Sequence, residues 1–366
     1  MAPRIFFLIA TLCAGSFVSA DNPALSAKLL SVKKIWDRAP HNAFTDLVRF
    51  KNRWYCVFRE GEGHAKGEGG LRVLVSKDGE AWESSALIEE KGRDLRDAKF
   101  AVTSDGRLML NGGSADPADR SPRGSFYSVV SFSKDGRAWS APQKISFKNP
   151  SENRFWLWRP VWHKGAAYGV AYQADPESPP NGRKFYAFVC RSRDGVNYER
   201  ISDDIAGATE AALEFDKNDV LTIALRGSSH QPKALLMQSP APYTSWTKKE
   251  LTADAGGDQI GGPALLRLPS GGLDGGLDGG LDGRLIGAGR RFSDKPSKEQ
   301  RTGLFLIDTD KATLTNLLIF PSGGDTSYPG LVWHHGKLWM SYYSSHEGKS
   351  SIYVAQIELK FELKSR

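Results

Sequence analysis

Several polar residues that could take part in a binding site lie at the ends of short β-type runs. They are Arg72, Arg159, Tyr172, Tyr342, His346 and Glu347. A guanidinium group can form two parallel hydrogen bonds with one carboxylate, which makes arginine the usual residue for such binding. The formal net charge is +7, but the basic residues stand singly between the predicted strands. A pocket with a few arginines around a small anion therefore fits better than a nucleic-acid surface.

The spacing of side chains does not predict a metal site or a nucleotide site. The adjacent His334 and His335 should face opposite sides of a strand, so they cannot converge on one ion. No glycine fingerprint follows a strand and opens a helix, so no nucleotide cofactor is implied, and we expect neither a metal nor a cofactor. Trp156 and Trp158 could stack on a sugar or fill the core between sheets; the sequence leaves both open.

The composition of the 366 residues favours a β-rich fold, with 38 Gly, 18 Phe, 11 Tyr and 10 Trp. Residues 1–20 have the pattern of a signal peptide: Arg4, an apolar run from Ile5 to Ala14, and small residues before position 21. That run is too short to span a membrane. We therefore expect a secreted or periplasmic protein whose residues 21–366 form one domain, with Cys56 and Cys190 buried and unpaired.

Three turns share the spelling Ser-x-Asp-Gly-x-x-aromatic, and each follows a β-type run. They are Ser76–Trp82, Ser133–Trp139 and Ser192–Tyr198, with the aspartates 57 and 59 residues apart. The Asp-Gly pair suits a tight turn between strands, and the Ser and Asp side chains can accept hydrogen bonds from turn amides. Weaker versions occur at Ser239–Trp246 and Asp308–Asp310. The repeated Gly-Gly-Leu-Asp in Gly271–Gly283 is interpreted as an expanded hairpin tip.

A second series of six strand pairs interleaves with these turns. They are 47–50 with 54–58, 100–102 with 108–110, 161–162 with 167–172, 211–215 with 220–225, 264–268 with 284–288, and 331–333 with 338–342. Two hairpins per unit make the four strands of a propeller blade. The sequence therefore predicts an all-β, six-bladed β-propeller, closed by pairing Leu29–Trp36 with the last strand, Ser351–Leu359.

The repeated turns in a six-bladed pattern resemble the Asp-boxes (BNR repeats) of the sialidase (neuraminidase) superfamily, although the usual box has one more residue before the Trp. Two sequence segments, which hold three residues that carry chemistry in that family, also match. Glu210, in the strand Thr209–Phe215, resembles the family's base, and Arg226 at the end of the next strand resembles its second arginine. Tyr328 in Asp325–Val332 resembles the nucleophile. The resemblance implies that a neutral phenol, deprotonated by Glu210, attacks a sugar whose own carboxylate would repel an anionic nucleophile.

The other arginines of the family match less well. For the third arginine we expect Arg301, with Arg290 close behind. The first is replaced: the expected Arg-Ile-Pro reads Asn42-Ala43-Phe44, and Arg59 or Arg96 could cover the same ground. This departure puts sialic acid itself in doubt as the substrate.

The acid/base residue remains open among three candidates. The family uses an Asp in a loop of the first blade, and the loop here contains no Asp. Glu68 is the closest match in position, His64 titrates in the right pH range, and Asp97 lies on the second blade.

These observations favour an exo-acting glycoside hydrolase for a terminal anionic sugar, so the expected partner is a glycan or glycoconjugate. The resemblance to sialidases extends over nearly the whole mature chain. Three alternatives remain. They are a propeller lyase that acts on uronates with His64 and Tyr328, another glycan hydrolase, and a carbohydrate-binding propeller without turnover. No pattern in the sequence fixes the oligomeric state, and we expect a monomer.

Overall fold

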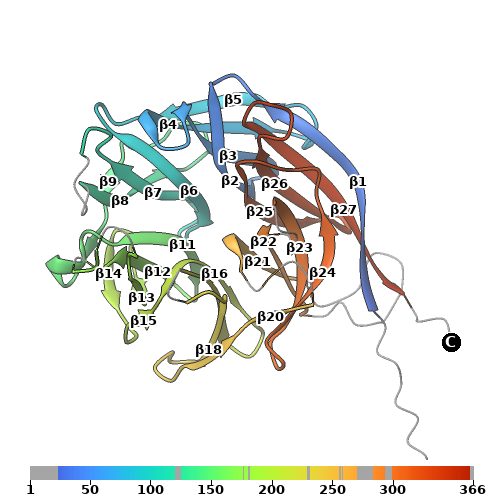
Figure 1. Ribbon diagram of the computed structural model, residues 1–366. Coiled ribbons are helices and arrows are strands. Elements are labelled where there is room, and N and C mark those ends of the chain that lie inside the picture. Colours follow the sequence, from blue (N-terminus) through green and yellow to red (C-terminus); the bar gives the residue numbers. More distant parts are fainter. Residues whose placement is uncertain are drawn as a thin grey trace, which may run out of the picture.

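The computed structural model is an all-β, six-bladed propeller (Figure 1). It describes residues 24–119, 125–175, 177–179, 182–228, 231–254, 257, 259–269, 283–292 and 299–362. The predicted signal peptide and most of the Gly-Gly-Leu-Asp segment lie outside these residues. Within the described ranges, no helix has the length and apolar character that crossing a bilayer requires.

Each blade is a sheet whose first strand lies nearest the centre of the ring. The first two blades are β2 (His41–Phe50), β3 (Arg53–Gly63), β4 (Lys66–Ser76) and β5 (Glu83–Ile88), then β6 (Asp94–Val102), β7 (Leu108–Ala115), β8 (Phe126–Ser133) and β9 (Gln143–Lys144). A single parallel pair, Gly69 with Asp94, links these two sheets. The third blade contains β11 (Trp156–His163), β12 (Ala166–Ala174), β13 (Phe185–Ser192) and β14 (Asn197–Arg200), with short β10 (Ser146–Phe147) and β15 (Ile205–Ala206) at its edge and the 3-10 turn Pro150–Glu152 before it.

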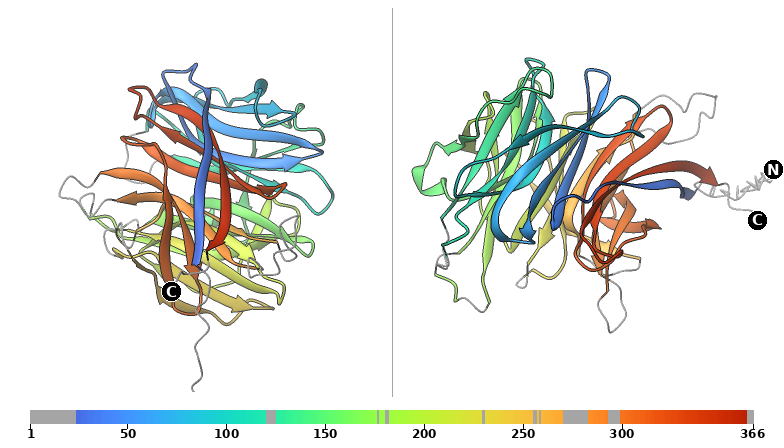
Figure 2. Two further views of the ribbon diagram at one scale, coloured as in Figure 1. Left: turned by 90° about the vertical axis from the view of Figure 1, so that its right-hand side faces the viewer. Right: turned by 90° about the horizontal axis from the view of Figure 1, so that it is seen from above.

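The remaining blades follow the same order. The fourth is β16 (Ala208–Phe215), β17 (Val220–Gly227), β18 (Leu235–Pro240) and β19 (Thr247–Glu250); the fifth is β21 (Gly261–Arg267), β22 (Leu285–Phe292), β23 (Gln300–Asp308) and β24 (Thr313–Ile319), with β20 (Thr252–Ala253) on its outer edge. The sixth is β25 (Thr326–His334), β26 (Lys337–Ser344), β27 (Ser351–Glu362) and β1 (Ala24–Trp36). The antiparallel pairing of β1 with β27 closes the ring as expected (Figure 2). All six predicted inner hairpins form.

The three Ser-x-Asp-Gly segments form turns between the third and fourth strands of the first three blades. In the second turn, Asp135 Oδ1 accepts hydrogen bonds from the amides of Arg137 and Ala138 at 2.8 and 2.9 Å, and Ser133 Oγ accepts one from the amide of Gly136. The first and third turns repeat this pattern. The glycine of each turn packs closely against a neighbouring blade: the last blade for the first turn, and the preceding blade for the other two. A side chain at any of these glycines would collide with an aromatic ring or a sulfur atom of that blade.

All six innermost strands contain a β-bulge at the same place. The strand pairing shifts between Ala43 and Asp46, Arg96 and Lys99, Trp158 and Val161, Ala208 and Ala211, Gly261 and Ala264, and Ser327 and Gly330. In five of the six the first bulged residue has positive φ; these are Phe44, Asp97, Arg159, Gly262 and Tyr328. In the fourth blade Thr209 and Glu210 fill the bulge. Bulges re-aim side chains and are common beside active sites, so the fold presents one unusual backbone position per blade at the centre.

The hydrophobic core lies between the blades and contains the two cysteines that were expected to be buried. Cys56 and Cys190 are both buried and free, as expected.

Candidate active site

Tyr328 and Glu210 meet at the centre of the ring. The Tyr328 hydroxyl donates a hydrogen bond of 2.5 Å to Glu210 Oε1, although 118 residues separate them in the chain. Both residues are only 6% exposed. Each lies in a bulge, on β25 and β16, which turns its side chain toward the other. The phenol and its predicted proton acceptor are therefore in direct contact.

Two further groups hold the Glu210 carboxylate. Arg226 Nη1 donates to Oε1 at 2.8 Å, and the amide of Gly262 donates to Oε2 at 2.7 Å. Arg226 Nη1 also lies 3.3 Å from the Tyr328 hydroxyl. The Arg226 side chain is 31% exposed, so a ligand can reach this group from solvent.

The pKa shifts of Tyr328 and Glu210 define the protonation states in which the pair starts. Burial would raise the pKa of Glu210, but the charge of Arg226 and the hydrogen bonds it accepts from Tyr328, Arg226 and Gly262 hold it below its usual value. Burial and the neighbouring Glu210 charge raise the pKa of Tyr328 well above its usual value, against Arg226 and Arg290. A neutral phenol thus faces an ionised carboxylate.

Of the two arginines considered for the third position, the structure places Arg290 beside the pair. Its guanidinium lies 5.3 Å from the centre of the Tyr328 ring and donates to the Thr326 carbonyl at 3.0 Å. The preferred Arg301 makes hydrogen bonds with Glu299 and the Ser322 carbonyl instead. The reason is the strand order: Arg290 is on β22, the second strand from the centre, whereas Arg301 is on β23, the third.

The segment Asn42-Ala43-Phe44, where the first arginine was expected, places an aromatic ring beside Tyr328. Phe44 occupies the bulge of β2, and its ring lies 5.2 Å from that of Tyr328. Of the suggested substitutes, Arg59 is fully buried and donates to Asp94 at 2.6 Å and to the Gly63 carbonyl. Arg96, on the innermost strand β6, is partly exposed and lies over the Trp156 ring at 5.3 Å. Arg96 is therefore the better placed of the two.

Among the acid/base candidates, Asp97 is the one that lies in the bulge of an innermost strand. It occupies the bulge of β6 with φ of 56°. Burial raises the pKa of Asp97 to about 6, opposed by the charge of Arg96 and reinforced by that of Glu210. A carboxyl group with such a pKa can donate a proton near neutral pH.

The other two candidates are held elsewhere. Glu68 accepts a hydrogen bond from the Gly92 amide at 2.9 Å and lines a surface hollow with Glu89 and Arg93. His64 is exposed, and its Nδ1 lies 2.6 Å from Asp325 Oδ2. Its ring packs on Phe44 at 5.0 Å, so it borders the site without touching Tyr328 or Glu210 in the described contacts.

The remaining residues that were expected to bind substrate make hydrogen bonds and ion pairs within the protein. Arg159 donates to Asp46 at 2.9 Å and to the Pro329 carbonyl at 2.7 Å, which holds the backbone one residue after Tyr328. Arg72, on the third strand of its blade, pairs with Glu60 at 2.8 Å. Tyr342 is buried, and its hydroxyl donates to the Pro321 carbonyl at 3.0 Å.

Several residues at the centre were not singled out for the site by the sequence. The buried Lys99 lies 5.8 Å from the Tyr328 ring centre and 5.7 Å from that of Trp158. Its Nζ donates to the Thr45 carbonyl at 2.6 Å, and burial together with the charge of Arg159 lowers its pKa to about 7. Tyr343 donates to Asp325 at 2.8 Å and lies 3.3 Å from Arg290. The sequence pattern did not mark them, because their contacts at the centre come from other strands.

Comparison with known proteins gives matches at the level of structure alone. No family model matches the chain, and no curated protein matches it in sequence. A protein of unknown function from Dyadobacter fermentans superposes with a TM-score of 0.73 at 18% identity, covering 92% of this chain and all of that one.

Sialidases also superpose on the chain. The Trypanosoma rangeli sialidase in its covalent complex with 2,3-difluorosialic acid gives a TM-score of 0.67 at 13% identity, and the Hadza microbial sialidase Hz136 gives 0.65 at 14%. They cover 91% and 88% of this chain, which spans 59% and 66% of theirs. At these identities the likeness establishes the fold: the chain is a propeller of the kind found in sialidases.

Proposed function

We propose that this protein is a retaining, exo-acting glycoside hydrolase that releases a terminal anionic sugar such as a sialic acid. The contact between the Tyr328 hydroxyl and Glu210, with Arg226 on both, carries the proposal. A second argument is the basic surroundings, because Arg226 and Arg290 flank the pair and could bind a substrate carboxylate.

The reaction has two steps. First, the Tyr328 oxygen attacks the anomeric carbon while its proton passes to Glu210; the glycosidic bond breaks, and Asp97 protonates the leaving oxygen. In the second step water attacks the same carbon and gives its proton to Asp97. The bond to Tyr328 breaks as the water oxygen attacks, and the phenolate regains its proton from Glu210. Arg226 stabilises negative charge on the phenol oxygen throughout.

The contacts favour hydrolysis over the lyase alternative. A lyase using His64 and Tyr328 as its acid/base pair needs both groups at one substrate carbon. Here the Tyr328 hydroxyl is bonded to Glu210, and His64 is bonded to Asp325. A carbohydrate-binding propeller is distinguished from a hydrolase by whether the protein turns over a glycoside.

The test is covalent trapping. The protein is screened with chromogenic glycosides, including a sialoside, then incubated with 2,3-difluorosialic acid and digested for mass spectrometry. We expect turnover of an anionic glycoside and one added sugar on the peptide that contains Tyr328. The Tyr328→Phe variant should bind the glycan but neither turn over nor become labelled. Binding without turnover by the unaltered protein would favour the binding propeller, and unsaturated products from polyuronates would favour the lyase.

A further inference from the structure

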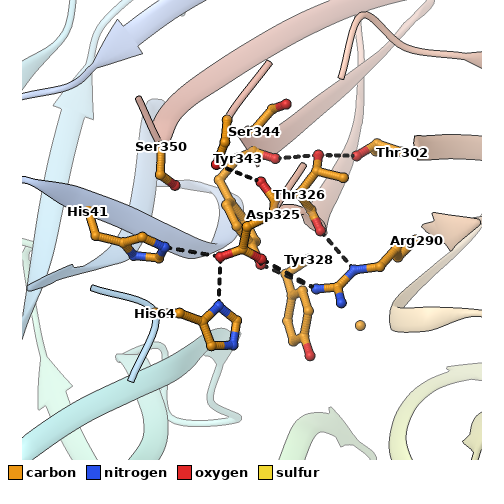
Figure 3. A network of polar contacts seen from close by, with 12 residues as sticks. His41, His64, Arg290, Thr302, Asp325, Thr326, Tyr328, Tyr343, Ser344 and Ser350 are labelled. Atoms are coloured by element: carbon orange, nitrogen blue, oxygen red, sulfur yellow. Dashed lines mark hydrogen bonds and ion pairs between the residues drawn. The ribbon is translucent and has the colours of Figure 1, made fainter. Parts of the chain in front are cut away.

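A second group of functional side chains lies next to the candidate active site, on the side of Asp325. His41 is at the start of β2, His64 is at the tip of the β3–β4 hairpin, and Asp325 precedes β25. His41 Nε2 lies 3.0 Å and His64 Nδ1 2.6 Å from the same oxygen, Asp325 Oδ2. Figure 3 shows the carboxylate between the two imidazoles, with the Tyr328 hydroxyl pointing away from it. The first and last blades thus bring together three side chains that are distant in sequence.

We propose that His41, His64 and Asp325 bind one first-row divalent transition ion of the zinc type. Two imidazole nitrogens and one carboxylate oxygen are a ligand set that suits such an ion. The three ligand atoms all lie within 4.8 Å of one another. Zinc–ligand distances of about 2.0–2.2 Å place ligand atoms roughly 3.3 Å apart in a tetrahedron, so small side-chain rotations would admit the ion.

The surroundings of Asp325 leave the proposed ligand oxygen available. The Tyr343 hydroxyl donates to the other oxygen, Oδ1, at 2.8 Å, and Arg290 Nη2 lies 3.9 Å from it. These contacts fix the orientation of the carboxylate and direct Oδ2 toward the two histidines. Outer contacts of this kind orient the ligands of metal sites.

The site is open to solvent and can adjust. The His64 side chain is 54% exposed, whereas those of His41 and Asp325 are 13% and 26% exposed. Three protein ligands leave a coordination position for water or a ligand oxygen. A bound ion would tie the hairpin tip of the first blade to the last blade, and would add positive charge beside Arg290. Metal binding by these three side chains would not depend on the proposed glycosidase activity.

Direct metal titration tests it. Tag-free full-length protein is freed of metal with a chelator and titrated with Zn²⁺ by calorimetry and with Co²⁺ by visible absorption. We expect one equivalent of each ion, d–d bands for the cobalt form, and a higher melting temperature with Zn²⁺. His64→Ala, an exposed change that should leave folding intact, and Asp325→Asn should each weaken binding at least about tenfold.

His346→Ala is the matched control, because His346 lies outside the cluster and contacts Ser344 and Glu347. Its affinity should equal that of the unaltered protein. Absence of stoichiometric binding, or unchanged affinity in His64→Ala, would overturn the metal site. Neither result affects the trapping experiment, which tests Tyr328 with a sugar.

Discussion

At the scale of single residues, the site depends on Glu210 being an ionised proton acceptor. Replacing it with Gln keeps the shape and the hydrogen bond to Tyr328 but removes the charge that accepts the phenol proton. We expect kcat for the anionic glycoside to fall about 10²- to 10⁴-fold, with little change in melting temperature. The steady-state rates and a thermal melt of Glu210→Gln measure both effects. Activity within a factor of three of the unaltered protein would exclude Glu210 as the base.

Asp97 gives a prediction that separates acid catalysis from binding. In Asp97→Asn, hydrolysis of a substrate with a poor leaving group should fall about 10²- to 10⁴-fold, whereas a nitrophenyl glycoside, whose leaving group needs no proton, should be much less affected. Because burial raises the pKa of Asp97 to about 6, activity on the poor leaving group should decline as pH rises through about 6. Equal losses on both substrates would remove Asp97 from the acid role.

The raised pKa of Asp97 also predicts how pH affects the stability of the Asp97→Asn variant. A carboxyl group whose folded pKa is raised favours folding most when protonated, and this contribution is lost as pH rises from the unfolded value through about 6. Asparagine has no charge to bury. Asp97→Asn should therefore be at least as stable as the unaltered protein at pH 8, which means that any loss of activity there cannot come from unfolding. Thermal melts at pH 4 and pH 8 check this.

At the scale of elements, the bulges explain what could and could not be predicted. Tyr328, Glu210 and Arg226 could be predicted because the strand sequences that contain them resemble those of sialidases. Lys99 and Asp325 could not, since their neighbours come from other blades. The spelling does hold one signal: Pro follows the bulged residue in Arg159-Pro160, Gly262-Pro263 and Tyr328-Pro329. Proline within a sheet is tolerated at bulges.

Strand order explains why Arg290, and not the preferred Arg301, lies beside Tyr328. Arg290 and Arg301 are both near a strand end in the sequence, and only the distance of each strand from the centre separates them. The proposed metal ligands His41, His64 and Asp325 could not be predicted either, because they have no common spacing in the sequence. Residues that converge across the closure of a ring leave no local pattern.

The Asp-Gly turns make a testable contribution to the packing of blades. Gly136 has φ of 75°, and a methyl group there would collide with the ring of Tyr55, whose hydroxyl donates to the Asp135 carbonyl at 2.8 Å. Gly136→Ala should cost about 2–4 kcal/mol from strain and crowding combined. Gly106→Ala is the control, because Gly106 has φ of 77° with open space around it. Urea unfolding of both variants should show the larger loss for Gly136→Ala; equal losses would mean that docking of the turn adds nothing.

At the scale of the whole molecule, the candidate nucleophile depends on the closure of the ring. Tyr328 lies on β25, and the sheet continues through β26 and β27 to β1, the strand from the other end of the chain. The β1–β27 pair extends from Ala24 with Glu362 to Trp36 with Ile352. Without β1, the long strand β27 would present an unpaired edge, which favours association with other chains.

Removing β1 should therefore harm both folding and the site. We compare a chain that starts at Ala24 with one that starts at Ile35, which loses most of β1 but keeps the buried Trp36. The shorter chain should melt at a lower temperature and scatter more light. Its labelling of Tyr328 by 2,3-difluorosialic acid should fall as well, because the sheet that positions β25 has lost its outer strand. If the two chains melt together, remain monodisperse and are labelled equally, β1 is an accessory strand, and the first five blades with β25–β27 suffice to hold Tyr328 against Glu210.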